Sequence, residues 1–428
     1  MAQSNFRLLN NAKKQTISFK LIHNLVVFPV EVNGKELNFI LDSGVGTTFL
    51  FNIKNKDSVE LKNVKKIKLK GLGSEASIDA ILSKGNTFSF NNIRSLNQNL
   101  YVIFNDSFDL SSKLGITIHG IIGYQILKDF IVKINYAKRK ITFYNSKTYN
   151  YKKCKKCEIL TLEFHKLKPY VNVGVKLDVN SNKITPVKLL IDSGGSDAMW
   201  LFENTHPDIL PPKKHFNDLL GEGLSGTIFG KRAIIKGIVL GKFELKKPTV
   251  SFPDSLSITH ALKFEERNGS LGASILKRFT VTFDYVNSKI TLKKASSYNA
   301  PFRYNMSGIE LVYNGKLLVE EKDNTSLTLF NNNKETIQQN KITFDYNYKY
   351  SFKPSYRIHS ISVGSPSFKA GLLPNDIVIK INGEYTHNLK LENIIEKFYQ
   401  KENKKISLEI ERNGQNYEYQ FRLKNMLK

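Results

Sequence analysis

The chain has 428 residues, of which 41% are hydrophobic, enough for roughly two to four domains with buried cores. Its 64 basic and 38 acidic side chains give a net charge of +26, but the lysines are spread through every segment without an RNP, helix-turn-helix or zinc-finger pattern, so we expect no nucleic acid partner. The sequence has no run of about 18 apolar residues and no metal or nucleophile motif around its histidines, so no membrane span, metal or cofactor is expected.

The first patterned segment covers residues 25–42. It reads "LVVFPVEVNGKELNFILD", with an Asn33-Gly34 turn signal between runs of apolar and β-branched residues. This pattern predicts a hairpin whose second strand ends at Asp42. Asp42 opens an Asp-Ser-Gly triplet between two apolar runs, and one such triplet alone fits an ordinary strand end.

The following segment predicts two strands joined by a glycine-rich tip. In "KKIKLKGLGSEASIDAIL" the tip consists of Gly71, Leu72, Gly73 and Ser74. Further along, "GYQILKDF" fits a short helix and "IVKINYAKRKITFY" fits a closing hairpin.

The chain then repeats itself. Residues 121–144 align without gaps on residues 270–293, with ten of 24 positions identical. The same offset of 149, give or take one residue, places Asp42 on Asp192. A second glycine-rich tip contains Gly221, Gly223 and Gly226. Two copies of one domain are therefore expected, at residues 1–150 and 151–298.

The only two cysteines, Cys154 and Cys157, lie in a lysine-rich linker between the two copies. There is no second pair to complete a zinc site and no strand-to-helix context for a redox site. A local disulfide and two unreactive thiols are both compatible with this spacing.

The pattern changes near residue 298. Residues 356–400 predict a strand, a one-turn helix, a strand with a tight Asn382-Gly383 turn, and an amphipathic helix. A last hairpin turns at Asn413-Gly414. We expect a separate α+β domain at residues 299–428, with an inserted polar loop near 322–340.

Two repeated aspartates suggest a specific chemistry. If the two copies pack about a pseudo-twofold axis, Asp42 and Asp192 meet at that axis. Two adjacent carboxylates do not both ionise readily, so the pair holds one shared proton. The ionised group can then accept a proton from a water molecule while the protonated group donates to a carbonyl oxygen.

These residues carry a resemblance to the aspartic protease family. Each copy has hydrophobic-hydrophobic-Asp-Ser-Gly, followed later by hydrophobic-hydrophobic-Gly in "GIIG" (residues 120–123) and "GSLG" (residues 269–272). The two-lobed arrangement resembles pepsins, and the compact lobes are more similar to retropepsin-like domains. The resemblance covers most of residues 20–295 and implies a mostly β fold, with two closed β-barrel lobes about a pseudo-twofold axis.

The resemblance also implies roles for individual residues. Asp42 and Asp192 would be the catalytic pair. Supporting roles would fall to Ser43, Gly44, Ser193 and Gly194, with the serines joining the lobes and the glycines letting the backbone approach the water. The flaps that cover the substrate would be formed by Gly71, Leu72, Gly73, Ser74, Gly221, Gly223 and Gly226, although ordinary hairpin turns fit these glycines equally well.

The sequence departs from the family pattern in two places. No tyrosine occurs between residues 62 and 99, where pepsin-like flaps carry one. Val45 and Gly195 stand where acid-active members have a hydroxyl that stabilises the ionised aspartate. Without that hydrogen bond the pair titrates at higher pH, so we expect activity at weakly acidic to neutral pH.

The third domain resembles a PDZ domain. "ISVGSPSFKAGLLPNDIVIKINGE" has the family's elements in the family's order. The resemblance implies binding of an extended peptide by strand addition. The loop beside that peptide would contain Gly308, Ile309, Glu310 and Leu311, which differs from the family's Gly-Leu-Gly-Phe, and a purely structural packing module is the alternative.

The sequence thus predicts an aspartic endopeptidase that acts on protein or peptide substrates as a monomer, with a PDZ domain whose peptide ligand is unknown. One alternative is a non-catalytic peptide-binding protein that acts through the PDZ domain, and another is polyanion binding through the basic surface. Ala2-Gln3 after Met1 reads like the remainder of a cleaved signal peptide. With a protease joined to a PDZ domain, this favours a bacterial protein in the periplasm or cell envelope, or secreted.

Overall fold

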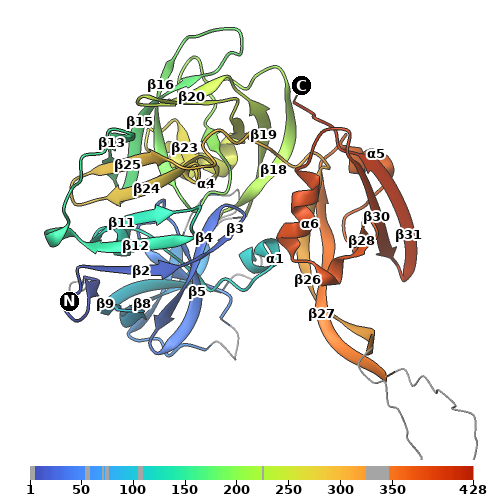
Figure 1. Ribbon diagram of the computed structural model, residues 1–428, viewed down its shortest axis with the longest axis horizontal. Coiled ribbons are helices and arrows are strands. Elements are labelled where there is room, and N and C mark those ends of the chain that lie inside the picture. The colour runs from blue at the N-terminus through green and yellow to red at the C-terminus, as the bar shows by residue number, and fades with distance from the viewer. Residues whose placement is uncertain are drawn as a thin grey trace, which may run out of the picture.

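The computed structural model describes residues 5–53, 58–69, 72, 77–104, 109–223, 226–323 and 347–427. Among them strands predominate, as the sequence predicts. Figure 1 shows two β lobes, one blue to cyan and one green to yellow, with an orange-red third domain beside them. We use "first lobe" for the elements up to β12, "second lobe" for β13 to α4, β24 and β25, and "third domain" for β26 onwards.

The first lobe is built mainly on one nine-stranded sheet. Its core path runs β1-β9-β6-β10-β5-β4-β8-β7, and β3 pairs with β4. An additional β8–β9 ladder connects six of these strands in a ring. The elements are β1 (Arg7–Leu8), β2 (Lys14–Ser18), β3 (Lys20–Ile22), β4 (Leu25–Val32), β5 (Lys35–Leu41), β6 (Thr48–Leu50), β7 (Val64–Leu69), β8 (Ile78–Phe90), β9 (Ile93–Ile103), α1 (Leu110–Leu114), β10 (Gly120–Ile122), α2 (Tyr124–Leu127), β11 (Phe130–Asn135), β12 (Lys140–Asn145) and the 3-10 turn η2 (Ser146–Thr148).

The second lobe repeats this order around a ten-stranded sheet. Among the described residues its ladders run as an open path from β18 to β21, so the closed barrels remain a prediction. The elements are β13 (Cys157–Thr161), β14 (Glu163–His165), β15 (Lys168–Lys176), β16 (Thr185–Asp192), β17 (Met199–Leu201), β18 (His215–Gly223), β19 (Gly226–Ile234), β20 (Gly237–Leu240), β21 (Phe243–Lys246), β22 (Thr249–Pro253), η3 (Ser255–Ile258), α3 (Thr259–Leu262), β23 (Gly269–Gly272), α4 (Ala273–Leu276), β24 (Phe279–Asp284) and β25 (Lys289–Lys294).

A six-stranded sheet joins the two lobes, in the order β13-β25-β24-β11-β12-β2. At its centre β11 pairs antiparallel with β24, so that Ile131 faces Asp284 and Asn135 faces Thr280. Because 131 and 280 are equivalent positions in the repeat, as are 135 and 284, the ladder is symmetric about its midpoint. The closing hairpins of the two copies therefore lie about a pseudo-twofold axis, and one core cluster extends through both lobes.

The third domain has its own sheet and core. The sheet order is β26-β27-β28-β30-β31, with β29 paired to β28. Buried side chains such as Ile358, Ile394 and Phe398 form a core cluster separate from that of the lobes. The elements are β26 (Ile309–Asp323), β27 (Asn347–Ile361), α5 (Pro366–Ala370), β28 (Ile377–Ile381), β29 (Glu384–Tyr385), η4 (Thr386–Asn388), α6 (Leu391–Phe398), β30 (Lys405–Arg412) and β31 (Gln415–Arg422).

The predicted loop insertion starts near the end of β26, in the long β26–β27 hairpin that projects from the third domain (Figure 1). Most of residues 322–340 lie outside the described part of the chain. The domain limits at 150 and 298 remain predictions.

The third domain packs against both lobes. Phe216 of β18 lies 5.7 Å from Tyr304, measured between ring centroids. A Cβ built on Gly115, at the end of α1, would lie 2.8 Å from the Cβ of Leu391 at the start of α6. Figure 1 shows α1 in cyan against the third domain, between the first lobe and α6.

Two further expectations concern the whole chain. Cys154 and Cys157 form a disulfide, which selects one of the two alternatives left open by the sequence. Within the described residues, no helix is long and apolar enough to cross a membrane.

Candidate active site

Each lobe presents one aspartate at the end of a buried strand. Asp42 follows β5, and Asp192 is the last residue of β16. In both lobes that strand pairs in parallel with the short strand containing the repeated glycine motif, β10 in the first lobe and β23 in the second. The Asp42 amide donates to the Ile122 carbonyl at 2.9 Å. The repeated sequence therefore folds into the same strand arrangement twice.

The glycines that end the two motifs are required by space. A Cβ on Gly123 would lie 1.9 Å from the carbonyl oxygen of Asp42. A Cβ on Gly272 would lie 2.2 Å from the carbonyl oxygen of Asp197. Because real Cβ atoms do not approach that closely, only glycine lets the aspartate loops pass over these strands. This explains why "GIIG" and "GSLG" accompany the two Asp-Ser-Gly triplets.

Ser43 and Ser193 connect the two loops across the pseudo-twofold axis. The Ser43 hydroxyl donates to the Ile191 carbonyl at 2.7 Å, and the Ser193 hydroxyl donates to the Leu41 carbonyl at 2.8 Å. Each hydroxyl also accepts from the other serine's amide, at 2.9 and 3.0 Å. Both serines are buried, so these four bonds fix the relative position of the two aspartates.

The carboxyl groups of Asp42 and Asp192, which we call the aspartate pair, are neighbours. The Gly44 amide donates to Asp42 Oδ1 at 2.6 Å, and the Gly194 amide donates to Asp192 Oδ1 at 3.1 Å. A Cβ on Gly194 would lie 2.3 Å from Asp42 Oδ2, and one on Gly44 would lie 3.2 Å from Asp192 Oδ1. Each glycine of the triplets thus contacts the carboxylate of the opposite lobe.

Burial raises the pKa of the Asp42 carboxyl well above its ordinary value, and the neighbouring Asp192 raises it further. The Gly44 amide and the Lys168 ammonium act in the opposite direction, because both favour the ionised form. The aspartate pair therefore keeps a proton to higher pH than an exposed aspartate does.

Lys168 places a positive charge near the aspartate pair, whereas the equivalent residue of the first lobe is apolar. It opens β15, directly after a tight turn whose residue Leu167 lies against Gly46 in the first lobe's aspartate loop. Burial lowers the pKa of the Lys168 ammonium, as does nearby Arg267, whereas Asp42 and Asp192 raise it. Leu25, which opens β4, occupies the equivalent position in the first lobe. Lys168 was not predicted from the sequence, although alignment of the two hairpins would have shown a lysine facing a leucine.

Leu72, in the predicted tip of the first lobe, lies against Gly223 of the β18–β19 hairpin. A Cβ on Gly223 would lie 2.0 Å from the carbonyl oxygen of Leu72. Leu72 also packs against Phe202, Ile258 and Ala261 of the second lobe. Gly221 and Gly226 lie in the β18–β19 hairpin, whereas Gly71, Gly73 and Ser74 fall outside the described residues. The contact between Leu72 and Gly223 is what two opposed flaps would make.

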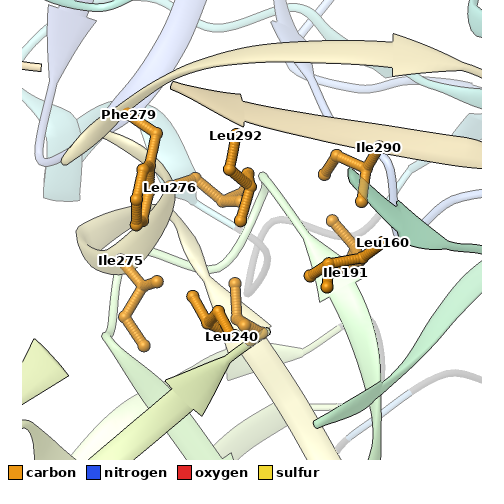
Figure 2. Close-up of a pocket in the computed structure, with 9 residues that line it drawn as sticks. Leu160, Ile191, Leu240, Ile275, Leu276, Phe279, Ile290 and Leu292 are labelled. Atoms are coloured by element: carbon orange, nitrogen blue, oxygen red, sulfur yellow. The ribbon is translucent and has the colours of Figure 1, made fainter. Parts of the chain in front are cut away.

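A small cavity lies in the core of the second lobe (Figure 2). Its volume is about 10 Å³, and Ile191, the residue before Asp192, is one of its walls. The side chains that line it are all apolar: Leu160, Ile191, Leu240, Leu271, Ile275, Leu276, Phe279, Ile290 and Leu292. A cavity of this size and lining is a gap in core packing and cannot hold a peptide.

The predicted PDZ loop is divided between core and surface. Ile309 and Leu311 are buried in the third domain's core. Gly308 has a left-handed φ of 81°, and a Cβ there would clash with Ser365. Glu310 lies outside the core, where Lys113 of α1 forms an ion pair with it at 3.3 Å. The first lobe therefore contacts the strand that would add a peptide.

Family models match one segment of the first lobe and one segment of the third domain. Residues 28–126 match the family model of an aspartyl protease domain, and residues 357–412 match that of a PDZ domain. A comparison with curated proteins finds no match. Among solved structures, the crystal structure of the aspartic proteinase from Irpex lacteus aligns with 67% of this chain and 99% of that chain, at 13% identity and a TM-score of 0.44. The chain contains an aspartyl protease domain and a PDZ domain.

Proposed function

We propose that the chain is an aspartic endopeptidase whose single site takes Asp42 from one lobe and Asp192 from the other. The observation that carries this proposal is the symmetric set of hydrogen bonds between Ser43 and Ser193, which brings the two carboxyl groups together within one chain. No group of three metal-binding side chains occurs in the part of the chain that the structure describes. The mechanism below uses only the two carboxyl groups and water.

In this mechanism the aspartate pair shares one proton and holds a water molecule. The ionised carboxylate accepts a proton from the water as its oxygen attacks the peptide carbonyl carbon. The protonated carboxyl donates its proton to the carbonyl oxygen, giving a tetrahedral diol. The carboxyl that now holds the proton donates it to the nitrogen, while the other carboxylate accepts a proton from one diol hydroxyl. The carbon–nitrogen bond breaks, a carboxylic acid and an amine leave, and the pair again shares one proton. The amides of Gly44 and Gly194 keep both carboxyl groups oriented throughout.

The glycine-rich tips and the third domain receive supporting roles in the proposal. The contact between Leu72 and Gly223 supports flaps that close over a bound peptide. β26 pairs only with β27 among the described strands, which supports peptide addition at its other edge. The Cys154–Cys157 disulfide supports a location outside the reducing cytosol.

Cleavage of an unfolded protein tests the proposed activity. The purified chain is expected to release peptides at pH 5–7, with inhibition by pepstatin, while Asp42→Asn and Asp192→Asn are each expected to lose activity by about 10³-fold or more. Glu203→Gln, which removes a surface carboxylate paired with Lys231, is the matched control. Cleavage at the wild-type rate by both aspartate variants would exclude this mechanism. Absence of cleavage by the wild type would leave peptide binding by the PDZ domain as the function.

A further inference from the structure

The second lobe's aspartate loop is connected to the third domain by four polar side chains, which we call the linking network. Asp197, five residues after Asp192, accepts from Arg232 Nη1 at 3.1 Å. Arg232 Nε donates to Asp218 Oδ2 at 2.7 Å. Asp218 Oδ1 accepts from the hydroxyl of Ser362 in the third domain at 3.1 Å. The linking network therefore joins the aspartate loop, both strands of the β18–β19 hairpin and the third domain.

Arg232 is the centre of the linking network. Its side chain is largely buried between two carboxylates on separate elements. Burial alone would lower the pKa of the Arg232 guanidinium, but Asp197 and Asp218 raise it above its ordinary value. The fork of a guanidinium can engage both acids at once, which a lysine cannot do with the same geometry. Replacing Arg232 would leave two carboxylates without their shared partner.

The hairpin held by this network is also the one whose tip meets Leu72. Beyond Asp218, Glu222 near the tip pairs with Lys113 of α1 at 2.8 Å, and Lys113 also pairs with Glu310 of the third domain. On the same side, Phe216 packs against Tyr304. Strand β18 thus contacts the third domain directly at Phe216 and Asp218, and indirectly at Glu222, through Lys113 of the first lobe.

We propose that Arg232 is a positioning residue through which the third domain sets the geometry of the Asp192 loop and of the β18–β19 flap. This inference rests on the proposed peptidase function and adds that the third domain is required for catalysis itself, beyond any role in binding partners. Loss of the Ser362–Asp218 hydrogen bond then changes the geometry of the Asp192 loop, because Arg232 and Asp197 connect the two. A domain that only tethers substrates would leave that site unchanged.

The chain's one tryptophan reports on this geometry without any need for activity. Trp200 Nε1 donates to Asp197 Oδ2 at 2.9 Å, and Ser251 also donates to that oxygen at 2.8 Å. A shift of Asp197 therefore changes the hydrogen bond of the indole and its emission. Because the chain contains no other tryptophan, the emission has a single source.

The test compares Ser362→Ala, Asp218→Asn, Arg232→Lys and Arg232→Met in the full-length chain, with kcat, KM and Trp200 emission as readouts. We expect kcat to fall about 3–10-fold for Ser362→Ala, the size expected for loss of one typical intramolecular hydrogen bond, and further for Asp218→Asn, with a shifted Trp200 emission in both. Arg232→Met is expected to be the most impaired variant, and Arg232→Lys to recover part of its kcat.

Two matched variants separate this role from general stability. Ser351→Ala removes a hydroxyl from the same strand, β27, where the Ser351 hydroxyl donates to Glu321 of the third domain. Arg412→Lys alters an ion pair with Asp376 inside the third domain. Both controls are expected to keep wild-type kcat and Trp200 emission, even where the unfolding temperature falls.

The outcomes distinguish the inference from the function on which it rests. Wild-type kcat, KM and emission in folded Ser362→Ala and Asp218→Asn would overturn the inference and leave the peptidase proposal intact. A chain whose cleavage does not depend on Asp42 and Asp192 would overturn the peptidase proposal. In that case a shift in Trp200 emission would retain the structural link between domains and remove its catalytic role.

Discussion

The two lobes hold their aspartate loops in different ways. In the first lobe, the Thr48 amide and hydroxyl both donate to Gln125 Oε1, and Gln125 in turn donates to the Asn99 carbonyl at 3.0 Å. In the second lobe the corresponding loop is held by Asp197 and Arg232, and through them by the third domain. One half of the candidate site is thus fixed within its own lobe, while the other half depends on a neighbouring domain.

The difference shows how a repeated sequence acquires separate tasks. Met199 and Ser274 occupy the positions equivalent to Thr48 and Gln125, so the second lobe lacks the side chains of the internal link. The backbone bonds that both lobes keep are those next to the aspartates. Symmetry is therefore retained where the two carboxyl groups meet, and lost in the side-chain contacts around them.

The largest expected effect tests whether both halves belong to one site in one chain. Asp42→Asn and Asp192→Asn are each expected to abolish cleavage, and a mixture of the two inactive variants is expected to remain inactive, because each chain supplies both aspartates. The measurement is the cleavage rate before and after mixing, with the wild type diluted equally as control. Recovery toward a quarter of wild-type activity would indicate a site shared between two chains.

The serines should give matched losses, because their bonds are symmetric. Ser43→Ala and Ser193→Ala each remove one donor and leave a buried carbonyl and a buried amide unpaired, so each is expected to destabilise the chain by about 2–4 kcal/mol. Urea unfolding of both variants measures the cost. A large loss for only one of them would mean that the two lobes are not fastened symmetrically.

The pH dependence should change when a hydroxyl is added beside Asp192. A Cβ on Gly195 would lie 3.3 Å from Asp192 Oδ2, so Gly195→Ser brings a donor to that carboxylate. The hydroxyl favours the ionised form, so the pair loses its shared proton at lower pH and the basic limb of the kcat/KM profile moves down by about one pH unit. Gly195→Ala, which adds the Cβ without the hydroxyl, is the control. An unchanged basic limb would refute the role given to the missing hydroxyls at Val45 and Gly195.

Removal of the positive charge of Lys168 is expected to move the basic limb of the kcat/KM profile in the opposite direction, and by less. Its positive charge lowers the pKa of Asp42, so Lys168→Met raises that pKa and moves the basic limb to higher pH, by about half a unit. Leu25→Lys, at the equivalent position of the first lobe, should move the limb down. Lys183→Met, an exposed lysine in the second lobe, serves as control. Identical profiles for all three variants would show that the cation at this position has no effect on the pair.

The sequence alone was enough to identify the repeat, the two Asp-Ser-Gly triplets and their paired glycines, because each is a local pattern that occurs twice. It also indicated the separate α+β domain through the change of pattern near residue 298. It could not show the β11–β24 ladder, since the pairing of distant strands leaves no periodic signal. Arg232 and Ser362 were not predicted for a similar reason. Neither belongs to a sequence motif, and only the fold brings both side chains to Asp218.

The most direct test of a single site built from both lobes is active-site titration of the full-length chain with a tight-binding transition-state analogue such as pepstatin, at weakly acidic pH. We predict that one inhibitor binds per chain of 48.9 kDa, and that tight binding is lost in both Asp42→Asn and Asp192→Asn. Binding of one inhibitor per two chains, or tight binding that survives either substitution, would contradict a site built from one aspartate of each lobe.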